Sequence, residues 1–403
     1  MRTALSKPEL LAPAGSMEAL CTAARFGADA VYIGGPALQL RAASAGFTRE
    51  DICKAADILH RQNKKLYVTV NSFAHDGEID QLAEYGRFLL QAGVDAAIVS
   101  DLGAIAELRA QVPELEIHVS TQANCLNARA AGVYASMGAR RIVAAREMSI
   151  ADIAQMHEKC PELEIEAFVH GAMCMAYSGR CLLSSFLVNR SGNRGECAQP
   201  CRWTYHLTEQ KRPGEFFALE QQEQGFALLS SRDLCCISFL DKLEQAGVRS
   251  FKIEGRMKSP YYVATIVNAY RLALDGGAQL SALEREVDSV SHRPYCPGFY
   301  FGAMPPYPPD SGAYIRDCAF AAVVLEDAAG GMVRIQQRNR FRRGDVLEVL
   351  RPGQIGESFT VTEIRTALGL FAEQANHAAE ELTINCPYPL QAGDMLRIRL
   401  SEE

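Results

Sequence analysis

A short unit that recurs through the first two thirds of the chain limits the possible fold more than any other feature. Each copy is an amphipathic helical segment that ends in Gly and is followed, after one or two residues, by a β-branched strand ending in polar residues. The copies lie at residues 26–34, 92–101, 137–144 and 246–254. Glycine just after a helix adopts the left-handed backbone conformation without a Cβ clash, so each copy predicts a helix that stops and feeds a strand. Such alternation is typical of an α/β fold.

The segments between these copies complete a set of eight candidate strands, mostly separated by helical patterns. They lie near residues 9–12, 30–34, 66–70, 96–100, 116–120, 141–145, 164–169 and 250–254. Eight such units predict a TIM-like (β/α)8 barrel. A doubly wound open sheet is the alternative, because the sequence alone does not show whether the first strand pairs with the eighth.

Composition divides the chain into three parts. Residues 1–275 form the expected barrel, with a cysteine-rich insertion at 171–235 after the seventh strand. Residues 276–311 contain a Pro-rich run at 305–309 and are typical of a linker. In residues 312–403, alternating segments are split by Gly-Asp turns, which predicts a small C-terminal β-barrel domain.

Charge and hydropathy exclude several classes of protein. The chain carries 41 Lys and Arg against 48 Asp and Glu, so any contact with a polyanion must be a local basic patch. No apolar run reaches the ~18–20 residues that cross a bilayer, and residues 1–8 leave no room for a signal-peptide core. We therefore expect a cytoplasmic protein with no membrane partner, whose 13 cysteines stay reduced.

Polar side chains follow the candidate strands at the end where a TIM-like barrel places its chemistry. They are Asn71, Asp101, Gln122, Asn124, Arg146, Glu147, His170, Glu254 and Arg256. Because the carboxyl ends of barrel strands converge, we expect these side chains to build one pocket. Each of them taken alone is equally well explained as a helix cap or a satisfied loop residue.

Five cysteines indicate a metal site in the insertion. Cys174, Cys181, Cys197 and Cys201 follow the seventh strand, and Cys235 lies shortly before the last one. Closely packed thiolates repel one another unless a cation holds them, which favours a metal ion or cluster. Only Cys197 and Cys201 have the short spacing of a zinc knuckle, so an iron–sulfur cluster is favoured over structural zinc. Burial as core side chains is the weakest alternative, because the surrounding residues are polar.

Basic residues gather in three places along the chain. They are Arg180, Arg190, Arg194, Arg202, Lys211 and Arg212 beside the cysteines, Lys252, Arg256 and Lys258 after the last barrel strand, and Arg334, Arg338, Arg340, Arg342 and Arg343 in the C-terminal domain. Such patches suit an RNA backbone, and Tyr177, Trp203 and Tyr205 suit stacking on an unpaired base. Solvated surface charge is the alternative, above all for the third patch.

The residues around the cysteines resemble the family historically named collagenase-like peptidases, family U-32. The likeness rests on EAFVHGAMC at 166–174, SGRC at 178–181 and FKIEGRMKS at 251–259, and it extends to 10–15, 195–203, 231–235, 297–302 and 337–341. It covers the barrel almost end to end. Within the family, the likeness is greatest to the prephenate-dependent tRNA uridine hydroxylases.

The resemblance implies an oxygen-independent hydroxylation that forms 5-hydroxyuridine at the wobble position of tRNA, with prephenate as the cosubstrate linked to the hydroxyl donor. It also implies a 4Fe-4S cluster held by Cys174, Cys181 and Cys197, with either Cys201 or Cys235 as the fourth ligand. Relatives act on ribosomal RNA cytidine or on ubiquinone precursors, so these substrates are alternatives within the same chemistry.

We expect a pocket for a small anionic carboxylate at the barrel end, and a basic rim that grips the anticodon stem-loop together with the C-terminal domain. Arg146, Arg256 and Lys258 are the candidates for contacts to the carboxylate or to phosphate, because guanidinium forks match these anions. Glu147 or Glu254 is expected to transfer protons.

Two rival classes are a peptidase and a zinc-bearing RNA-binding protein. A cysteine peptidase needs a thiolate beside a His base, and His170 with Cys174 could be written as such a pair. Four further cysteines have no place in that scheme. Colourless, zinc-loaded protein would instead favour the binding module.

Overall fold

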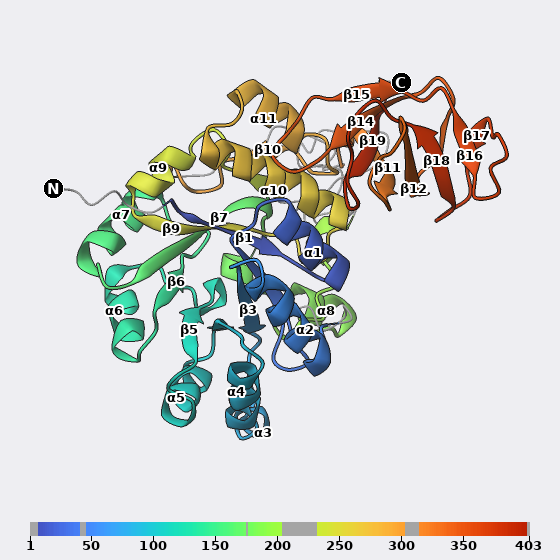
Figure 1. Cartoon of the computed structure of the whole chain (residues 1–403). Helices are drawn as coiled ribbons and strands as arrows, with labels where there is room; N and C mark the ends of the chain where they lie inside the picture. The colour runs from blue at the N-terminus through green and yellow to red at the C-terminus, as the bar shows by residue number, and fades with distance from the viewer. Residues whose placement is uncertain (1–6, 41–45, 175, 204–231, 303–313, 401–403) are drawn as a thin grey trace, which may run out of the picture. The chain divides into compact units, whose positions relative to one another are not determined.

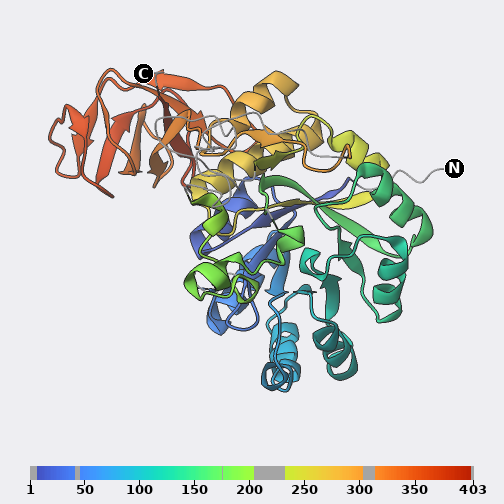
Figure 2. The same ribbon diagram turned by 180° about the vertical axis from the view of Figure 1, so that it is seen from behind.

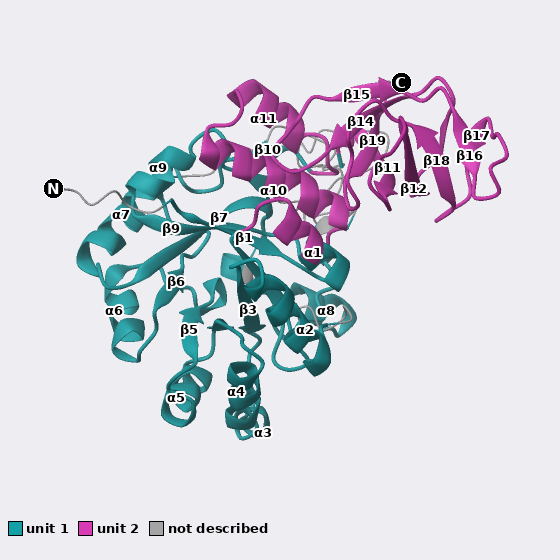
Figure 3. Cartoon of the chain, viewed as in Figure 1, with its two compact units in different colours: residues 1–20, 29–257, 293–314 teal, residues 21–28, 258–292, 315–403 magenta. Residues whose placement is uncertain are grey.

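The computed structural model describes residues 7–40, 46–174, 176–203, 232–302 and 314–400. Two compact units make up the chain (Figure 3). The first comprises residues 1–20, 29–257 and 293–314, and the second comprises residues 21–28, 258–292 and 315–403. Helix α1 (Met17–Arg25) crosses the boundary between them.

Eight parallel strands form a closed barrel in the first unit (Figures 1 and 2). They are β1 (Glu9–Pro13), β2 (Ala30–Gly34), β3 (Lys65–Val70), β4 (Ala96–Val99), β5 (Glu116–Val119), β6 (Arg141–Val143), β7 (Glu164–Ala172) and β9 (Val248–Ile253). Neighbouring strands pair in chain order, and β9 pairs with both β7 and β1, so the ring closes. The predicted TIM-like barrel is therefore confirmed, and the alternative of an open sheet is wrong.

Helices connect these strands and lie around the outside of the ring (Figure 1). They are α2 (Arg49–His60), α3 (Asp76–Ile79), α4 (Leu82–Gln91), α5 (Leu102–Gln111), α6 (Ala128–Ser136), α7 (Ile150–Lys159) and α9 (Leu240–Gln245). Side-chain caps fix where several of them begin. Thr48 and Ser149 form capping boxes at α2 and α7, and Asn127 accepts a hydrogen bond from the Ala130 amide at α6.

The glycines predicted to end helices have the predicted backbone conformation. Gly27, Gly93, Gly138 and Gly247 all have positive φ angles. Gly247 has a φ of +99°, and a Cβ atom there would lie 2.3 Å from the ring of His157. Any other side chain at this position would therefore meet both backbone strain and a direct clash.

Strand β7 is longer than its neighbours and carries the insertion. Its first part pairs with β6 and β9 in the ring, whereas its end pairs antiparallel with β8 (Asp233–Cys235), which in turn pairs with β10 (Tyr295–Cys296). The described part of the insertion contains η2 (Tyr177–Gly179), α8 (Leu183–Val188), η3 (Gly192–Arg194) and η4 (Pro200–Arg202), in green in Figure 2. The Cys236 amide donates to the Val169 carbonyl at 2.9 Å, which joins the two ends of the insertion.

Charged side chains fill one layer of the barrel interior. The fully buried carboxylate of Glu166 accepts hydrogen bonds from Lys252 Nζ at 2.7 Å and from Arg141 Nη1 at 3.1 Å. Arg141 also donates to Glu9 at 2.6 Å and to Glu164 at 2.8 Å. Burial alone would raise the pKa of Glu166, but the positive charges of Lys252 and Arg141 outweigh it and lower that pKa to about 2. We call these five residues the charged layer.

The second unit contains an antiparallel sheet and two helices. Its strands are β11 (Cys318–Val324), β12 (Met332–Gln337), β13 (Phe341–Arg342), β14 (Val346–Leu350), β15 (Ser358–Thr360), β16 (Ile364–Thr366), β17 (Gln374–Ala375), β18 (Glu381–Asn385) and β19 (Met395–Arg399). Seven of them follow the order β15-β14-β19-β11-β12-β18-β16, and β13 pairs with β17. The sequence predicted a small C-terminal β-barrel domain, and this part of the chain does form a β domain of antiparallel strands. Within the described strands, no pairing joins β15 to β16 to close the sheet into a hydrogen-bonded barrel.

Helices α10 (Pro260–Asp275) and α11 (Leu280–Val287) belong to this second unit. Tyr261 on α10 stacks on Phe320 of β11, and Glu286 on α11 accepts two hydrogen bonds from Arg397 of β19, at 2.9 and 2.7 Å. The segment 276–311, whose composition is typical of a linker, therefore includes regular structure at α11 and at β10. No helix within the described ranges is long and apolar enough to span a bilayer.

Candidate functional site

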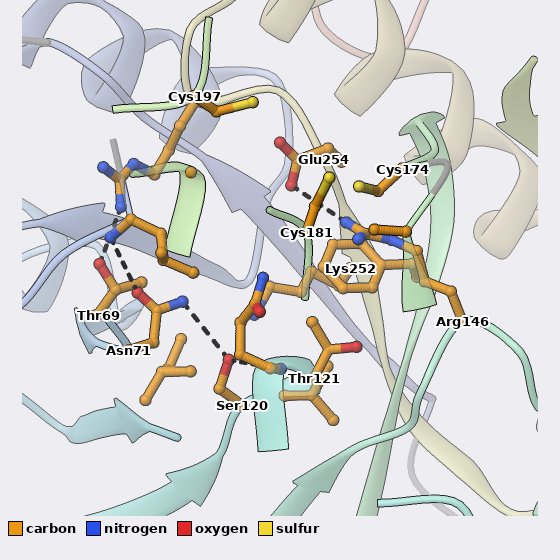
Figure 4. A pocket seen from close by; sticks show the side chains of 18 of the residues that line it. Thr69, Asn71, Ser120, Thr121, Arg146, Cys174, Cys181, Cys197, Lys252 and Glu254 are labelled. Atoms are coloured by element: carbon orange, nitrogen blue, oxygen red, sulfur yellow. Dashed lines mark hydrogen bonds and ion pairs between the residues drawn. The ribbon is translucent and has the colours of Figure 1, made fainter. Parts of the chain in front are cut away.

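A cavity of about 250 Å³ lies at the carboxyl ends of the barrel strands (Figure 4). Five of the residues expected to converge there do line it: Asn71, Gln122, Arg146, Glu254 and Arg256. They come from the ends of four strands that are far apart in the sequence. The convergence arises because the ring brings together all the strand ends that carry polar residues.

Other polar residues at the strand ends have local roles instead. Asp101 caps helix α5 by accepting from the Ala104 amide at 3.0 Å. His170 is buried, does not line the cavity, and lies 3.5 Å through Nε2 from the hydroxyl of Tyr295. Asn124 has a left-handed backbone at the end of η1 (Thr121–Ala123). For Asp101 the alternative of a helix cap therefore holds.

Arg256 is a nearly buried cation on the cavity wall. Its guanidinium donates to Thr69 Oγ1 at 2.8 Å and to the side chain of Gln39. A Cβ atom at residue 34 would lie 2.5 Å from Arg256 Nη2, so glycine there leaves room for the guanidinium.

Two further cations flank one aromatic ring in the cavity. The Arg146 guanidinium lies 4.2 Å from the centre of the Phe168 ring, and Lys252 Nζ lies 5.6 Å from the same centre and 4.4 Å from that of Tyr32. The Arg146 head is 3.7 Å from Glu254 Oε2. Contacts of this kind hold both cations against apolar surface while their charged heads remain at the cavity.

Lys252 is a site residue that the sequence pattern placed wrongly. It was grouped with a surface patch, but it is nearly buried and lines the cavity. Side chains alternate along a strand, so Lys252 faces the same way as Glu254 two residues later. That alternation is the signal that identifies it. Lys258, which was expected to contact the anion, lies in the second unit and is not among the lining residues.

Four cysteines of the insertion open on the same cavity. Cys174, Cys181, Cys197 and Cys201 are lining residues, and each is at least partly exposed. The Leu183 amide donates to Cys181 Sγ at 3.4 Å, and the Gln199 amide donates to Cys197 Sγ at 3.3 Å. Amide donors of this kind stabilise thiolates and are common around iron–sulfur ligands.

Cys235 is not a lining residue. It lies on β8, opposite His170 in the register of β7 and β8, and is partly exposed. Within the described ranges, no three Cys, His, Asp or Glu side chains are grouped tightly enough to hold a single metal ion. The thiols are thus spread around a cavity and do not converge on one point.

Besides the hydrogen bonds from Arg180 to the Gln122 carbonyl and from the Phe73 amide to the Asn193 carbonyl, two carboxylates of the barrel attach the insertion. Between the first two cysteines, the Ser178 amide donates to Glu147 Oε1 at 2.6 Å, and the Ser178 hydroxyl donates to Oε2 at 2.5 Å. Before the third cysteine, Arg194 donates to both oxygens of Glu78, at 3.0 and 2.9 Å, and to the Phe73 carbonyl at 2.7 Å. Glu147, which was expected to transfer protons, thus has both oxygens occupied by Ser178.

The basic patches differ in accessibility. Lys252 and Arg256 face the cavity, so the second patch is not an exposed surface. In the third patch, Arg334 pairs with Glu326 and Glu381, and Arg343 pairs with Glu373, as expected for solvated surface charge. In the first patch Arg180 and Arg190 are exposed, and so are the rings of Tyr177 and Trp203. Lys211, Arg212 and Tyr205, named from the sequence, lie outside the described residues.

These features define a class of protein: a TIM-like barrel whose mouth holds cations from several strands under a cysteine-bearing insertion. Comparison with known families gives the assignment. Residues 15–306 match the description "Peptidase family U32", and residues 316–397 match "Peptidase family U32 C-terminal domain". The chain belongs to peptidase family U32, as the sequence motifs predicted.

Several relatives are similar over two thirds or more of this chain. The chain is 37% identical to "tRNA hydroxylation protein P1" of Bacillus subtilis, over 98% of this chain and 96% of that protein. It is 34% identical to "tRNA hydroxylation protein P" of Escherichia coli, over 90% of both chains. Over 66% of this chain and 39% of the relative, it is 40% identical to the "23S rRNA 5-hydroxycytidine C2501 synthase" of Escherichia coli.

Proposed function

We propose that this protein is a tRNA hydroxylase that forms 5-hydroxyuridine at the wobble position in an oxygen-independent, prephenate-dependent reaction using an iron–sulfur cluster. The observation that carries the proposal is that four cysteines and the cations Arg146 and Arg256 face one cavity. Relatives named for tRNA hydroxylation match nearly the whole chain, which favours tRNA over the alternatives of ribosomal RNA or a ubiquinone precursor.

The arrangement of the thiols fits a cluster better than zinc. One zinc ion needs its four ligands about 2.3 Å from one point, whereas these thiols surround a cavity large enough for a group of several atoms. Cys174, Cys181 and Cys197 would hold the cluster, and Cys201 or Cys235 would supply the fourth thiolate. When bound, such a cluster supplies one-electron redox chemistry.

The charges of the cavity suit a small dianion. Three of the described lining residues, Arg146, Lys252 and Arg256, have cationic side chains. Among the same described residues, Glu254 is the only one with a carboxylate side chain. Thr69, which holds the head of Arg256, lies well away from Arg146 and Lys252 in the view of Figure 4. Prephenate carries two carboxylates, so one can meet Arg256 and the other can meet Arg146 and Lys252.

The exposed part of the insertion suits an unpaired RNA loop. Arg180 and Arg190 offer charge to the phosphates of an anticodon stem-loop, while Tyr177 and Trp203 offer rings on which a splayed base can stack. Glu254, at the cavity wall beside Arg146, is the remaining candidate for holding a proton near the reacting base.

The rival peptidase mechanism lacks support in the contacts of its base. His170 is buried, does not line the cavity and lies 3.5 Å through Nε2 from the Tyr295 hydroxyl, whereas Cys174 is a lining residue. A thiol peptidase needs the imidazole within hydrogen-bonding reach of the thiol. Simultaneous loss of Cys174 and Cys181 should therefore abolish hydroxylation and reveal no peptide cleavage.

The first test is mass spectrometry of tRNA and ribosomal RNA nucleosides from cells with and without the gene. We expect 5-hydroxyuridine to disappear from tRNA and to return with the wild-type gene. Loss of a ribosomal cytidine modification with tRNA unchanged would contradict the proposal. Iron and sulfide content of anaerobically purified protein tests the cluster directly.

Serine variants then identify the ligands. Loss of Cys174, Cys181 or Cys197 should remove iron, whereas Cys53→Ser, at an exposed position on α2, is the matched control. Comparison of Cys201→Ser with Cys235→Ser assigns the fourth thiolate to the variant that loses its iron. Full iron retention in Cys174→Ser, Cys181→Ser and Cys197→Ser would contradict the cluster.

A further inference from the structure

The turn between the first two cysteines has an unusual backbone conformation. Ser178 has φ 40° and ψ 39°, in the left-handed region that non-glycine residues seldom adopt. Its side chain is buried even though its neighbour Tyr177 is exposed. Such a conformation persists only where surrounding contacts enforce it.

Glu147 supplies those contacts. One carboxylate oxygen accepts the Ser178 amide at 2.6 Å and the other accepts the Ser178 hydroxyl at 2.5 Å, so both donors of the strained residue go to one acidic side chain. Hydrogen bonds to a charged acceptor are stronger than those between neutral groups. The two bonds can therefore hold a conformation that the backbone alone disfavours.

The position of Glu147 links this turn to the cavity. It directly follows Arg146, which lines the cavity and stacks on Phe168. Both residues lie in the turn that follows β6, a strand paired on both sides within the ring. Two adjacent residues of one turn thus line the cavity and contact the cysteine-bearing turn.

We infer that Glu147 is a positioning residue: its carboxylate fixes the segment 176–181, and so sets where Cys181 lies relative to Arg146. The inference rests on the proposed function for what the thiol binds, but the clamp itself is a property of the protein chain. Glu147 acts through Ser178 and Cys181, and each of its carboxylate oxygens already accepts a hydrogen bond from the turn.

The second attachment of the insertion gives a matched comparison. Arg194 and Glu78 are each about one third exposed, and Arg194 keeps a further bond to the Phe73 carbonyl when Glu78 is changed. Glu78→Gln should therefore loosen the insertion much less than Glu147→Gln, although both substitutions remove one carboxylate charge bonded to the same insertion.

The experiment compares Glu147→Gln, Ser178→Ala and Glu78→Gln in the full-length, anaerobically purified protein. Amide hydrogen exchange of peptides covering 176–181 should be several-fold faster in Glu147→Gln, slightly faster in Ser178→Ala, which keeps the amide bond to Glu147, and unchanged in Glu78→Gln. Iron content and the rate at which the visible absorbance bleaches in air should follow the same order. Thermal unfolding checks that each variant is folded.

Wild-type exchange, iron content and bleaching rate in folded Glu147→Gln would overturn the inference. Equal effects of Glu147→Gln and Glu78→Gln would overturn it too, because they would indicate general loosening. If wild-type protein holds no iron, the proposed cluster fails, while the exchange comparison still decides the clamp. Ser178→Ala gives a second reading if Glu147→Gln does not fold.

Discussion

The charged layer inside the barrel and the cations around the cavity both include residues on β6 or β9 or shortly after them, but they differ in their partners. Glu166 accepts from Lys252 and Arg141 at 2.7 and 3.1 Å with no exposure to water. Arg146, by contrast, is 3.7 Å from Glu254 and lies against an aromatic ring. Close pairing commits a charge to the fold, whereas a longer contact leaves donors that an anion can use. Lys252 belongs to both sets.

Removing the acid of the charged layer should have the largest effect on stability. Glu166→Gln leaves Arg141 and Lys252 buried with less compensating charge, and breaking a buried pair in this way costs about 3–5 kcal/mol. Urea unfolding followed by circular dichroism measures the loss. Glu84→Gln, which breaks an exposed pair with Arg49, is the control. A loss no greater than the control's would mean that the layer is not a coupled network.

Changing a cavity cation should affect the reaction more than the fold. Arg256→Gln removes a charged donor from the proposed anion site, and such hydrogen bonds contribute about 1.5–3 kcal/mol, or about 10- to 100-fold in affinity. We expect the KM for prephenate to rise by that factor in a hydroxylation assay on tRNA. Lys258→Gln, outside the cavity, should leave the KM unchanged. A KM that rises in Lys258→Gln but not in Arg256→Gln would mean that the anion does not bind at Arg256.

The charged layer should also appear as a loss of stability in acid. The pKa of Glu166 falls from an ordinary value of 4.5 to about 2 in the folded protein. Below pH 4.5 the unfolded chain therefore takes up a proton that the folded protein does not, and stability declines as the pH falls toward about 2. The free energy of unfolding, measured between pH 4.5 and about 2, should fall with pH more steeply in the wild-type protein than in Glu166→Gln. Identical pH profiles would contradict the assigned cause.

Exposed pairs should contribute least. Arg334 lies between Glu326 and Glu381 on the surface of the C-terminal sheet, and its two partners are about half exposed. Arg334→Gln should lower the free energy of unfolding far less than Glu166→Gln does, and less still at high salt, because water and ions screen an exposed pair. Urea unfolding at two salt concentrations measures this. A salt-independent loss as large as that of Glu166→Gln would show that exposure alone does not distinguish the two kinds of pairing.

The barrel could be predicted because its signals are local. Helix-ending glycines such as Gly93 and Gly247, followed by β-branched residues, define four of the eight strands regardless of what the rest of the chain does. The sequence left an open sheet as an alternative to a closed ring, because the pairing of β9 with β1 joins residues at opposite ends of the barrel sequence.

The site could be predicted only in part, because its remaining members depend on contacts between distant segments. Four of the five candidate cysteines and Arg146 carry chemistry that is visible in the sequence, and they do line one cavity. The role of Lys252 depends on which face of β9 turns inward and on Glu166 lying on the neighbouring strand β7, which is far from β9 in the sequence. The hydrogen bonds from Ser178 to Glu147 join two segments whose contact no sequence motif predicts.

The extra length of β7 has a consequence for how the family can vary. The insertion lies between Val169 and Cys236. The Cys236 amide donates a hydrogen bond to the Val169 carbonyl, so the two ends of the insertion lie close together. The strand order of the barrel, in which β7 pairs with β9, does not depend on the residues between these two ends. Substituting or lengthening residues within the insertion can therefore change which molecule the cavity binds without changing how the barrel strands pair.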